Sequence, residues 1–378
     1  MVSASEFFPL GVATGRAHCN RAQERDELAG NVREGVHTWL WARRRIGKTS
    51  LIEQVLRDVE PDIVTTRLDL LVVHDANAFE TRLRAAVEQA GSRLAPRKRS
   101  SASILTSAFS ALKPELSFGA FGLRLKLAAP NQAGEGIVEM LLALDAAAGA
   151  YGRRVAFVLD EFQQLSELQN GAPRSLEGAV RHAVERARNV TYVFAGSRKH
   201  LLASMFEDED RPLYRLCRKM TLKRISAEDY RDFLRRAGRT RWRRQVPAEA
   251  IDGVLALTHR HPHYVNALCA PLWRAEAPPT ADDVAAMWAK LVAEEGGVAA
   301  GRIARLAPSQ RALLRAIAAA EDGVPHPTSH AFLGRLRLPA STGVRARDAL
   351  ERDDLIQQQA DGRWTLVDPA MAAWLRRL

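Results

Sequence analysis

Apolar runs alternate with amphipathic segments along the first 220 residues, and this alternation predicts the order of strands and helices. Four runs are continuous enough to be buried strands, at 36–41, 63–73, 155–159 and 190–195. Apolar residues at helical spacing predict helices after residue 48 and at 76–90 and 136–151. Strands that alternate with helices imply right-handed crossovers and a parallel sheet, so the fold class is α/β with the ligand at the carboxyl ends of the strands.

Residues 95–132 interrupt this alternation. They begin with the basic run Arg97-Lys98-Arg99 and continue with alternating segments around 116–118 and 123–125. This pattern indicates a surface insertion between a helix and a strand, for which a hairpin is one possible form.

The C-terminal part follows a helical pattern. Ser226 and the acids after it form a capping-box-like start for helices that reach about residue 296. Beyond residue 306, three helices are predicted, from residue 308, at 329–336 and at 341–352. A hairpin around the turn at 360–362 comes next, and Asp368 as cap with Pro369 at the first position opens a last helix. This order of helices and hairpin is that of a winged helix.

The most specific chemical pattern follows the first predicted strand. It consists of Ala42, Arg43, Arg44, Arg45, Ile46, Gly47, Lys48, Thr49 and Ser50. A strand that delivers a loop to a helix N-terminus is the setting of a phosphate-binding loop, and we expect ATP as its ligand. Lys48 would reach the β- and γ-phosphates, and the Thr49 hydroxyl would coordinate Mg²⁺. Ala42 stands where the first glycine is usual, which a loop tolerates if φ stays negative there.

Two later strands end in polar residues that complete such a site. The run at 155–159 ends in Asp160 and Glu161, a Walker B pattern in which Asp160 would hold Mg²⁺ through water. Glu161 would orient or deprotonate the attacking water. The alternative is a solvent-facing acidic pair that caps the next helix. Ser197 follows the run at 190–195, where such sheets place a polar sensor of the γ-phosphate.

These motifs together resemble the archaeal-type ATPase family, in the AAA+/STAND branch of P-loop ATPases. The resemblance is carried by Asn20-Arg21-xx-Glu24, by the segment at 44–51, by Asp160-Glu161-Phe162-Gln163 and by the segment at 194–197, and it continues at Phe206, 211–214, 261–265 and 368–369. It covers nearly the whole chain. The family implies an ATPase core, here 1–222, a helical lid at 223–300 and a winged helix at 301–378, with a biological role that differs between members.

The resemblance also suggests roles for residues outside the loop and strand ends. Arg21 could lie near the adenine or pair with Glu24. His261 or Pro262 could contact the nucleotide from the lid, although His259 or His261 stands where the family has a glycine. A metal site at His259, His261 and His263 is not expected, because Pro262 interrupts them and no cysteine or carboxylate is near. No second sensor arginine stands out, as in STAND proteins that read the nucleotide by movement of the winged helix.

Arg211 and Arg215 lie where AAA+ relatives place an arginine finger, with Arg181 and Arg198 as further candidates. A finger would reach the γ-phosphate on a neighbouring subunit, so the active enzyme would be an oligomer. The alternative is a salt bridge within the subunit to the acidic run at 207–210.

Composition adds a possible partner. The 378 residues carry a net charge of +11, and 211–244 alone hold eleven Arg and two Lys against three acids. Such a cluster suits a DNA backbone, with Arg345 and Arg347 of the winged helix as further contacts. The alternative is a solvated helix face. No apolar stretch approaches the roughly 20 residues of a membrane span, and the three scattered cysteines predict neither disulfides nor zinc, so we expect a cytoplasmic protein.

The sequence therefore predicts an ATP-dependent switch that acts on DNA as an oligomer. One alternative is a signalling or defence regulator whose winged helix binds protein. Another is a nucleotide-locked scaffold with negligible turnover, which the departures at Ala42 and His261 would favour.

Overall fold

The computed structural model describes residues 6–94, 116–119, 122–125, 135–168 and 173–378. The chain forms two compact units. The sheet unit contains Arg21–Arg44 and Lys48–Leu222. The helical unit contains Met1–Asn20, Arg45–Gly47 and Lys223–Leu378.

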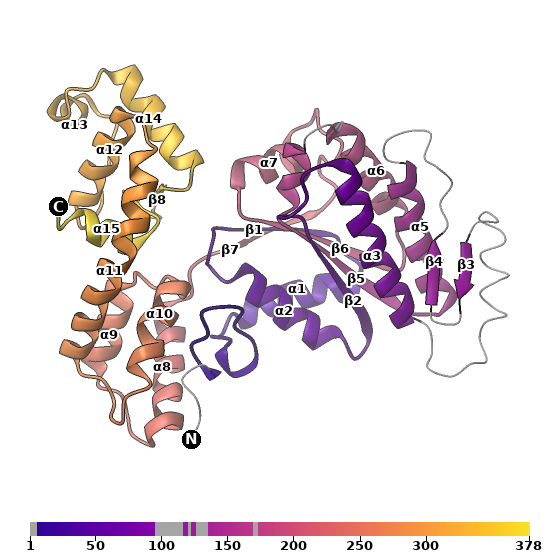
Figure 1. Cartoon of the computed structure of the whole chain (residues 1–378), viewed down its shortest axis with the longest axis horizontal. Coiled ribbons are helices and arrows are strands. Elements are labelled where there is room, and N and C mark those ends of the chain that lie inside the picture. Colours follow the sequence, from indigo (N-terminus) through magenta and orange to yellow (C-terminus); the bar gives the residue numbers. More distant parts are fainter. Residues whose placement is uncertain (1–5, 95–115, 120–121, 126–134, 169–172) are drawn as a thin grey trace. The chain divides into compact units, whose positions relative to one another are not determined.

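A five-stranded parallel sheet forms the centre of the sheet unit, which confirms the predicted fold class (Figure 1). Its order is β2-β5-β6-β1-β7. The strands are β1 (Thr38–Ala42), β2 (Ile63–Asp69), β5 (Arg154–Asp160), β6 (Val190–Gly196) and β7 (Arg218–Leu222). The sequence pattern did not predict β7, because Arg218 and Lys219 of this edge strand are exposed.

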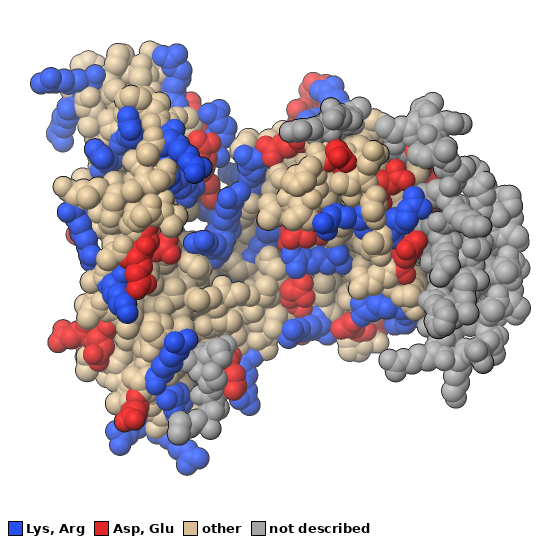
Figure 2. Space-filling view, viewed as in Figure 1, with Lys and Arg blue, Asp and Glu red and all other residues tan. Residues whose placement is uncertain are grey.

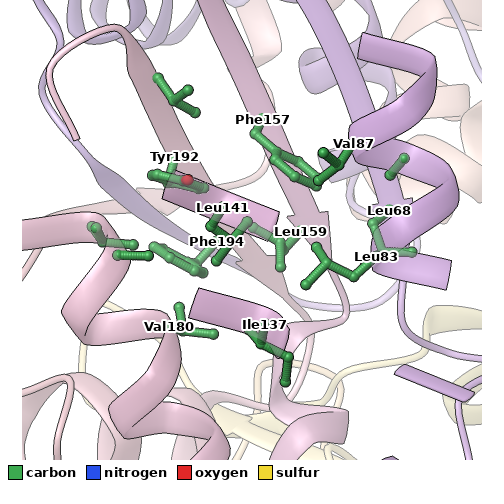
Figure 3. Packing of buried hydrophobic residues seen from close by; sticks show 14 of the residues in the cluster. Leu68, Leu83, Val87, Ile137, Leu141, Phe157, Leu159, Val180, Tyr192 and Phe194 are labelled. Atoms are coloured by element: carbon green, nitrogen blue, oxygen red, sulfur yellow. The ribbon is translucent and has the colours of Figure 1, made fainter. Parts of the chain in front are cut away.

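Helices cover both faces of the sheet (Figure 1). One face carries α1 (Ala22–Glu34) and α2 (Lys48–Val59). The other carries α3 (Ala76–Leu94), α5 (Glu135–Ala150), α6 (Pro173–Arg186) and α7 (Lys199–Glu207). Alternate residues of the central strands, such as Phe157, Leu159 and Phe194, pack against Leu83 of α3 and Ile137 of α5 (Figure 3). This core fixes the strand ends, on which the site depends.

The insertion contains a hairpin, as the sequence pattern suggested. Strands β3 (Leu116–Gly119) and β4 (Gly122–Leu125) pair antiparallel. The basic run at 97–99 lies outside the described residues.

The helical unit begins with a helical segment of α8 (Ala227–Trp242), α9 (Ala248–Leu257), α10 (Pro262–Leu272) and α11 (Ala281–Ala304). The predicted helix start is confirmed, because the Ser226 side chain accepts a hydrogen bond from the Asp229 N–H. In the same unit, Phe7 and Phe8 from the N-terminal segment pack against Phe233 of α8.

The rest of this unit has the predicted winged-helix order. It comprises α12 (Pro308–Ala319), α13 (His330–Arg335), α14 (Ala340–Arg352), β8 (Ile356–Gln358), β9 (Trp364–Leu366) and α15 (Pro369–Leu375). Asp368 caps α15 by accepting hydrogen bonds from the Ala370 and Met371 N–H groups. Among the described residues, no helix combines the length and apolar character needed to cross a membrane.

Helix α11 belongs to two hydrophobic clusters. Val284, Trp288 and Val292 pack with α8–α10, whereas Ala299 and Ile303 pack with the winged helix. One continuous helix therefore runs through the cores of both the helical segment α8–α11 and the winged helix. We expect these two parts to move together, because bending them apart would break a helix in its middle.

Candidate nucleotide-binding site

The loop between β1 and α2 has the backbone of a tight turn. Strand β1 ends at Ala42 and α2 begins at Lys48. Positive φ angles occur at Arg45 (62°) and Gly47 (97°), and Ala42 has none. Ala42 therefore meets the condition under which alanine can replace the first glycine, whereas Gly47 occupies a conformation that favours glycine. Within the loop, Ile46 is buried and Arg44 is exposed.

Lys48 faces the acidic pair that follows β5. Its Nζ forms ion pairs with Oδ1 of Asp160 and, at 3.0 Å, with Oε1 of Glu161. The Lys48 and Asp160 side chains are 7% and 2% exposed, so these charges are held away from solvent. Thr49 and Ser50 continue in the first turn of α2. The parallel sheet thus brings the two halves of the site together, since β1 and β5 end at the same edge.

Glu161 is held by two further side chains. The Ser197 hydroxyl, just after β6, donates a 2.8 Å hydrogen bond to its Oε2, and the Gln163 amide donates to the same oxygen at 2.6 Å. Burial would raise the pKa of Glu161, but Lys48, Gln163 and Ser197 outweigh it and lower the pKa. Glu161 is therefore ionised, and two hydrogen bonds hold its carboxylate in one orientation. The structure contradicts the alternative that Asp160 and Glu161 face solvent, because Asp160 is buried.

Asp160 has a second cation beside it that the sequence pattern did not predict. Arg67 of β2 lies 2.7 Å from Oδ2 of Asp160, and the Glu161 N–H donates to Oδ1 at 2.9 Å. Burial would raise the pKa of Asp160, but Lys48 and Arg67 reverse the effect and lower it. The signal that could have identified Arg67 is a charge inside the apolar run at 63–73. For Gln163, the signal is a polar residue between Phe162 and Leu165.

The residues here fit Mg²⁺ with a nucleotide. Asp160 is an ionised carboxylate, Thr49 carries a hydroxyl, and these hard oxygen donors are the ligand types that Mg²⁺ prefers. Few protein ligands are needed, because Mg²⁺ in such sites also binds substrate phosphates and water.

Other predicted residues have partners of their own. Arg21 is buried and pairs with Glu24 at 3.0 Å, which is one of the two predicted arrangements. Arg181 pairs with Glu185 at 2.7 Å, and Arg198 pairs with Glu167.

Arg211 and Arg215 differ in their surroundings. Arg211 forms a two-pronged ion pair with Glu177 of α6, through Nε at 3.0 Å and through Nη2. Glu177 is 0% exposed, and its pKa is raised because burial outweighs the effect of Arg211. The predicted alternative was a salt bridge within the chain to the acidic run at 207–210. Arg211 does form a salt bridge within the chain, but its partner is Glu177. Arg215 is exposed, has a φ of 53° and lies over the Tyr214 ring.

His261 and Pro262 lie in the helical unit, where His261 is the residue just before α10 and Pro262 is the first residue of this helix. The His261 ring is 4% exposed and packs against Tyr264, and its Nδ1 is buried with no hydrogen-bond partner among the residues that the structure describes. Burial, followed by the charge of Arg224, lowers its pKa to about 3, so the ring is neutral.

Some arginines of the basic segment at 211–244 form hydrogen bonds within the chain, and others are exposed. Arg241 donates to the carbonyl of Trp273, and Trp242 packs on the Trp273 ring, so neither is presented to a ligand. The buried residues of α8, such as Phe233 and Ala237, lie on its inner side. Its outer side presents three exposed arginines, and a fourth is the residue that ends the helix; we call these the α8 stripe: Arg235, Arg236, Arg239 and Arg243. Arg235 also lies 3.4 Å from Asp232 on the same side of the helix.

The two predicted winged-helix arginines also differ. Arg345 is exposed on α14. Arg347 pairs with Asp348 and lies 5.6 Å from the centre of the Trp364 ring. The exposed side of α14 also carries Asp348 and Glu351, so it is close to neutral.

Comparisons with known proteins agree with this architecture. Residues 301–377 match a family model described as "Probable winged helix domain". A Walker-type ATPase of Pyrococcus abyssi is 18% identical, with 98% of this chain and 99% of that chain covered and a TM-score of 0.70. The ORC2 protein of Aeropyrum pernix, solved in its ADPNP-ADP complexes, is 14% identical, with 99% and 96% covered and a TM-score of 0.62. No protein with a curated functional description matches. The chain thus has the fold of archaeal Walker-type ATPases with a C-terminal winged helix, and the predicted resemblance is confirmed at that level.

Proposed function

We propose that the chain is an ATP-hydrolysing switch that acts on DNA. The observation that carries the ATPase part is the convergence of Lys48, Asp160, Glu161 and Ser197 at one edge of the sheet. Phosphoryl transfer to water requires a cation for the phosphates, a carboxylate for the metal, a base for the water and a polar group that contacts the γ-phosphate.

Each side chain has a definite role in this proposal. Lys48 exchanges its carboxylate partners for the β- and γ-phosphates of ATP, and Thr49 and Asp160 are the residues that would hold Mg²⁺. When bound, Mg²⁺ neutralises part of the triphosphate charge. Glu161 accepts a proton from the attacking water, a role that its ionised state supports. Ser197 donates to Glu161 and can exchange this acceptor for a phosphate oxygen.

Phosphate release tests the ATPase part. We expect Lys48→Ala to abolish nucleotide binding, and Glu161→Gln to retain binding while turnover falls by about 10²-fold or more. Lys199→Ala is the matched control, because Lys199 is an exposed lysine that lies over Trp41. Turnover that survives Lys48→Ala would refute the proposal. Binding without turnover in the wild type would favour the nucleotide-locked scaffold.

Of Arg211 and Arg215, the first two candidates for an arginine finger, Arg215 suits the role better. Arg211 is already paired with the buried Glu177, and removal of Arg211 would leave that carboxyl group buried without this partner. Arg215 is exposed and stands in the same segment before β7. If Arg215 reaches the γ-phosphate of a neighbouring copy, the active form is a homo-oligomer.

The DNA part of the proposal rests on the α8 stripe. Arg235, Arg236 and Arg239 lie on one side of the helix within about 6 Å, at 1.5 Å per residue, and Arg243 follows at its end. Lys and Arg outnumber Asp and Glu on the face of the helical unit that Figure 2 shows. Such a row neutralises backbone phosphates without reading bases, so we propose DNA binding of low sequence preference. Arg345 would add one further phosphate contact.

A second candidate function is regulation through a protein bound to the winged helix. The near-neutral exposed side of α14 favours it, because Val344 is 38% exposed there and Arg347 is already paired with Asp348. DNA binding that survives loss of the α8 stripe but depends on Arg345 would argue against this candidate. Nucleotide-independent behaviour toward DNA would argue for it.

A further inference from the structure

Arg67 connects two carboxylates at the edge of the candidate site. Its Nη2 lies 2.7 Å from Oδ2 of Asp160, and its Nη1 lies 2.9 Å from Oε1 of Glu53 on α2. The arginine comes from β2, which pairs with β5 so that Asp69 is level with Asp160. Three elements of the sheet unit, β2, β5 and α2, are therefore joined through one guanidinium group.

The two oxygens of Asp160 have different cations. Oδ1 faces Lys48 and the Glu161 N–H, whereas Oδ2 faces Arg67. Lys48 cannot remain on Oδ1 in the proposed function, because its amino group is then needed at the phosphates. Arg67 has no such second task, since Glu53 holds its other nitrogen in place.

The local charge balance favours a cation that stays on Oδ2 of Asp160. Asp160 is 2% exposed and lies beside Glu161, while Asp69 is 3.9 Å from Arg67. A buried carboxylate without a partner is costly, and nearby carboxylates add repulsion. Once Lys48 serves the phosphates, Arg67 is the neighbouring cation of the chain that still compensates Asp160.

We propose that Arg67, anchored by Glu53, is a positioning residue that holds Oδ2 of Asp160 so that Oδ1 points toward Mg²⁺ bound with ATP. The inference rests on the proposed function. Residues that orient a metal ligand in this way contribute about 10- to 100-fold to metal affinity when they are measured by substitution. Arg67 would then affect nucleotide binding only where Mg²⁺ is present.

The test measures binding of a fluorescent ATP analogue while MgCl₂ is titrated, with a parallel titration in EDTA. For Arg67→Met we expect the Mg²⁺ midpoint to rise by about 10-fold or more, while affinity in EDTA stays within about two-fold of the wild type. Arg67→Lys keeps the positive charge but cannot contact Glu53 and Asp160 at the same time. Its Mg²⁺ midpoint should lie between those of the wild type and Arg67→Met. Glu53→Gln removes only the anchor and should give a smaller shift in the same direction.

Arg93→Met is the matched control. Arg93 also joins a carboxylate, Glu60, to β2 through the Thr65 carbonyl, but it does not contact Asp160. This variant should leave the Mg²⁺ midpoint unchanged. If Arg67→Met does not fold, as judged by circular dichroism, Arg67→Lys and Glu53→Gln decide the matter.

An unchanged Mg²⁺ midpoint in the folded Arg67 variants, beside a wild type that responds to Mg²⁺, would overturn the inference alone. A lower midpoint would overturn it as well, since Arg67 would then compete with the metal. A wild type that binds no nucleotide in either titration would overturn the proposed function and the inference with it.

Discussion

The side-chain amide of Gln163 donates a 2.6 Å hydrogen bond to Oε2 of Glu161, the oxygen that also accepts from Ser197. Gln163 is itself fixed, because it is 2% exposed and its Oε1 lies against Gly196 so closely that a Cβ there would overlap it. A glycine at the end of β6 thus makes room for the side chain that orients the proposed base.

Replacing Gln163 by Leu should lower ATP turnover by about 10-fold and change KM little, because it removes an orienting hydrogen bond but no phosphate contact. Gly196→Ala should act in the same direction by displacing the amide. Gln164→Leu is the control, since Gln164 is half-buried one residue further on. Equal turnover in the Gln163 and Gln164 variants would contradict this role.

Arg211 and Arg215 should separate stability from turnover. Arg211→Ala should lower the free energy of unfolding by about 3 kcal/mol, because it leaves Glu177 buried without its partner. Arg215→Ala should leave the urea midpoint almost unchanged but lower turnover at concentrations where the protein self-associates. A stable Arg211→Ala protein, or an Arg215→Ala protein of full activity, would argue against these assignments.

The neutral state of His261 should make stability depend on pH. Its pKa is lowered to about 3 in the folded chain, chiefly by burial, from an ordinary value near 6.5. Between these values the unfolded chain binds the extra proton, so stability falls as pH falls below about 6.5 and the loss continues to about pH 3. At pH 5 the free energy of unfolding is lower by about 2 kcal/mol than at neutral pH because of His261.

Denaturant titrations at pH 7 and pH 5 measure this effect. His261→Phe should have a smaller loss of stability between the two pH values than the wild type, whereas His326→Phe, at an exposed position, should resemble the wild type. His259 and His263, whose pKa values are also lowered, remain in both variants and contribute equally. An unchanged loss in His261→Phe would show that this ring is not buried in its neutral form.

The α8 stripe makes a prediction about salt. Arg235→Ala combined with Arg239→Ala should weaken DNA binding across sequences and reduce the slope of log K against log salt by about 2. Arg241→Ala is an informative control, because its guanidinium donates to the Trp273 carbonyl. It should affect stability more than the salt slope. Equal slopes in the wild type and the double variant would exclude the stripe as the DNA-binding surface.

The sequence predicted the elements whose own residues carry a strong local signal. Buried strands such as β5 have continuous apolar runs, and α15 begins at a cap that its Asp368-Pro369 pair specifies. Strand β7 was missed because an edge strand can expose Arg218 and Lys219 and is held by pairing with β1. Its stability comes from a neighbour that is distant in the sequence.

The same distinction applies to the candidate site. Lys48, Asp160, Glu161 and Ser197 follow strands in recognisable motifs, so their convergence could be predicted from a parallel sheet. Arg67 acts through Glu53 and Asp160, which lie on two other elements, and only the strand register brings them together. The partner of Arg211 was missed for the same reason. Glu177 is a buried residue of α6, and only the fold brings this helix next to Arg211.

The most direct test of an ATP-gated switch on DNA is a titration of labelled duplex DNA at two salt concentrations. It compares ADP with ATP for the wild type and includes ATP with Glu161→Gln. We predict that ATP tightens binding, that the hydrolysis-deficient variant binds most tightly, and that affinity falls steeply with salt. Binding that is absent, or the same with ADP and with ATP, would contradict the account and direct attention to a protein partner of the winged helix.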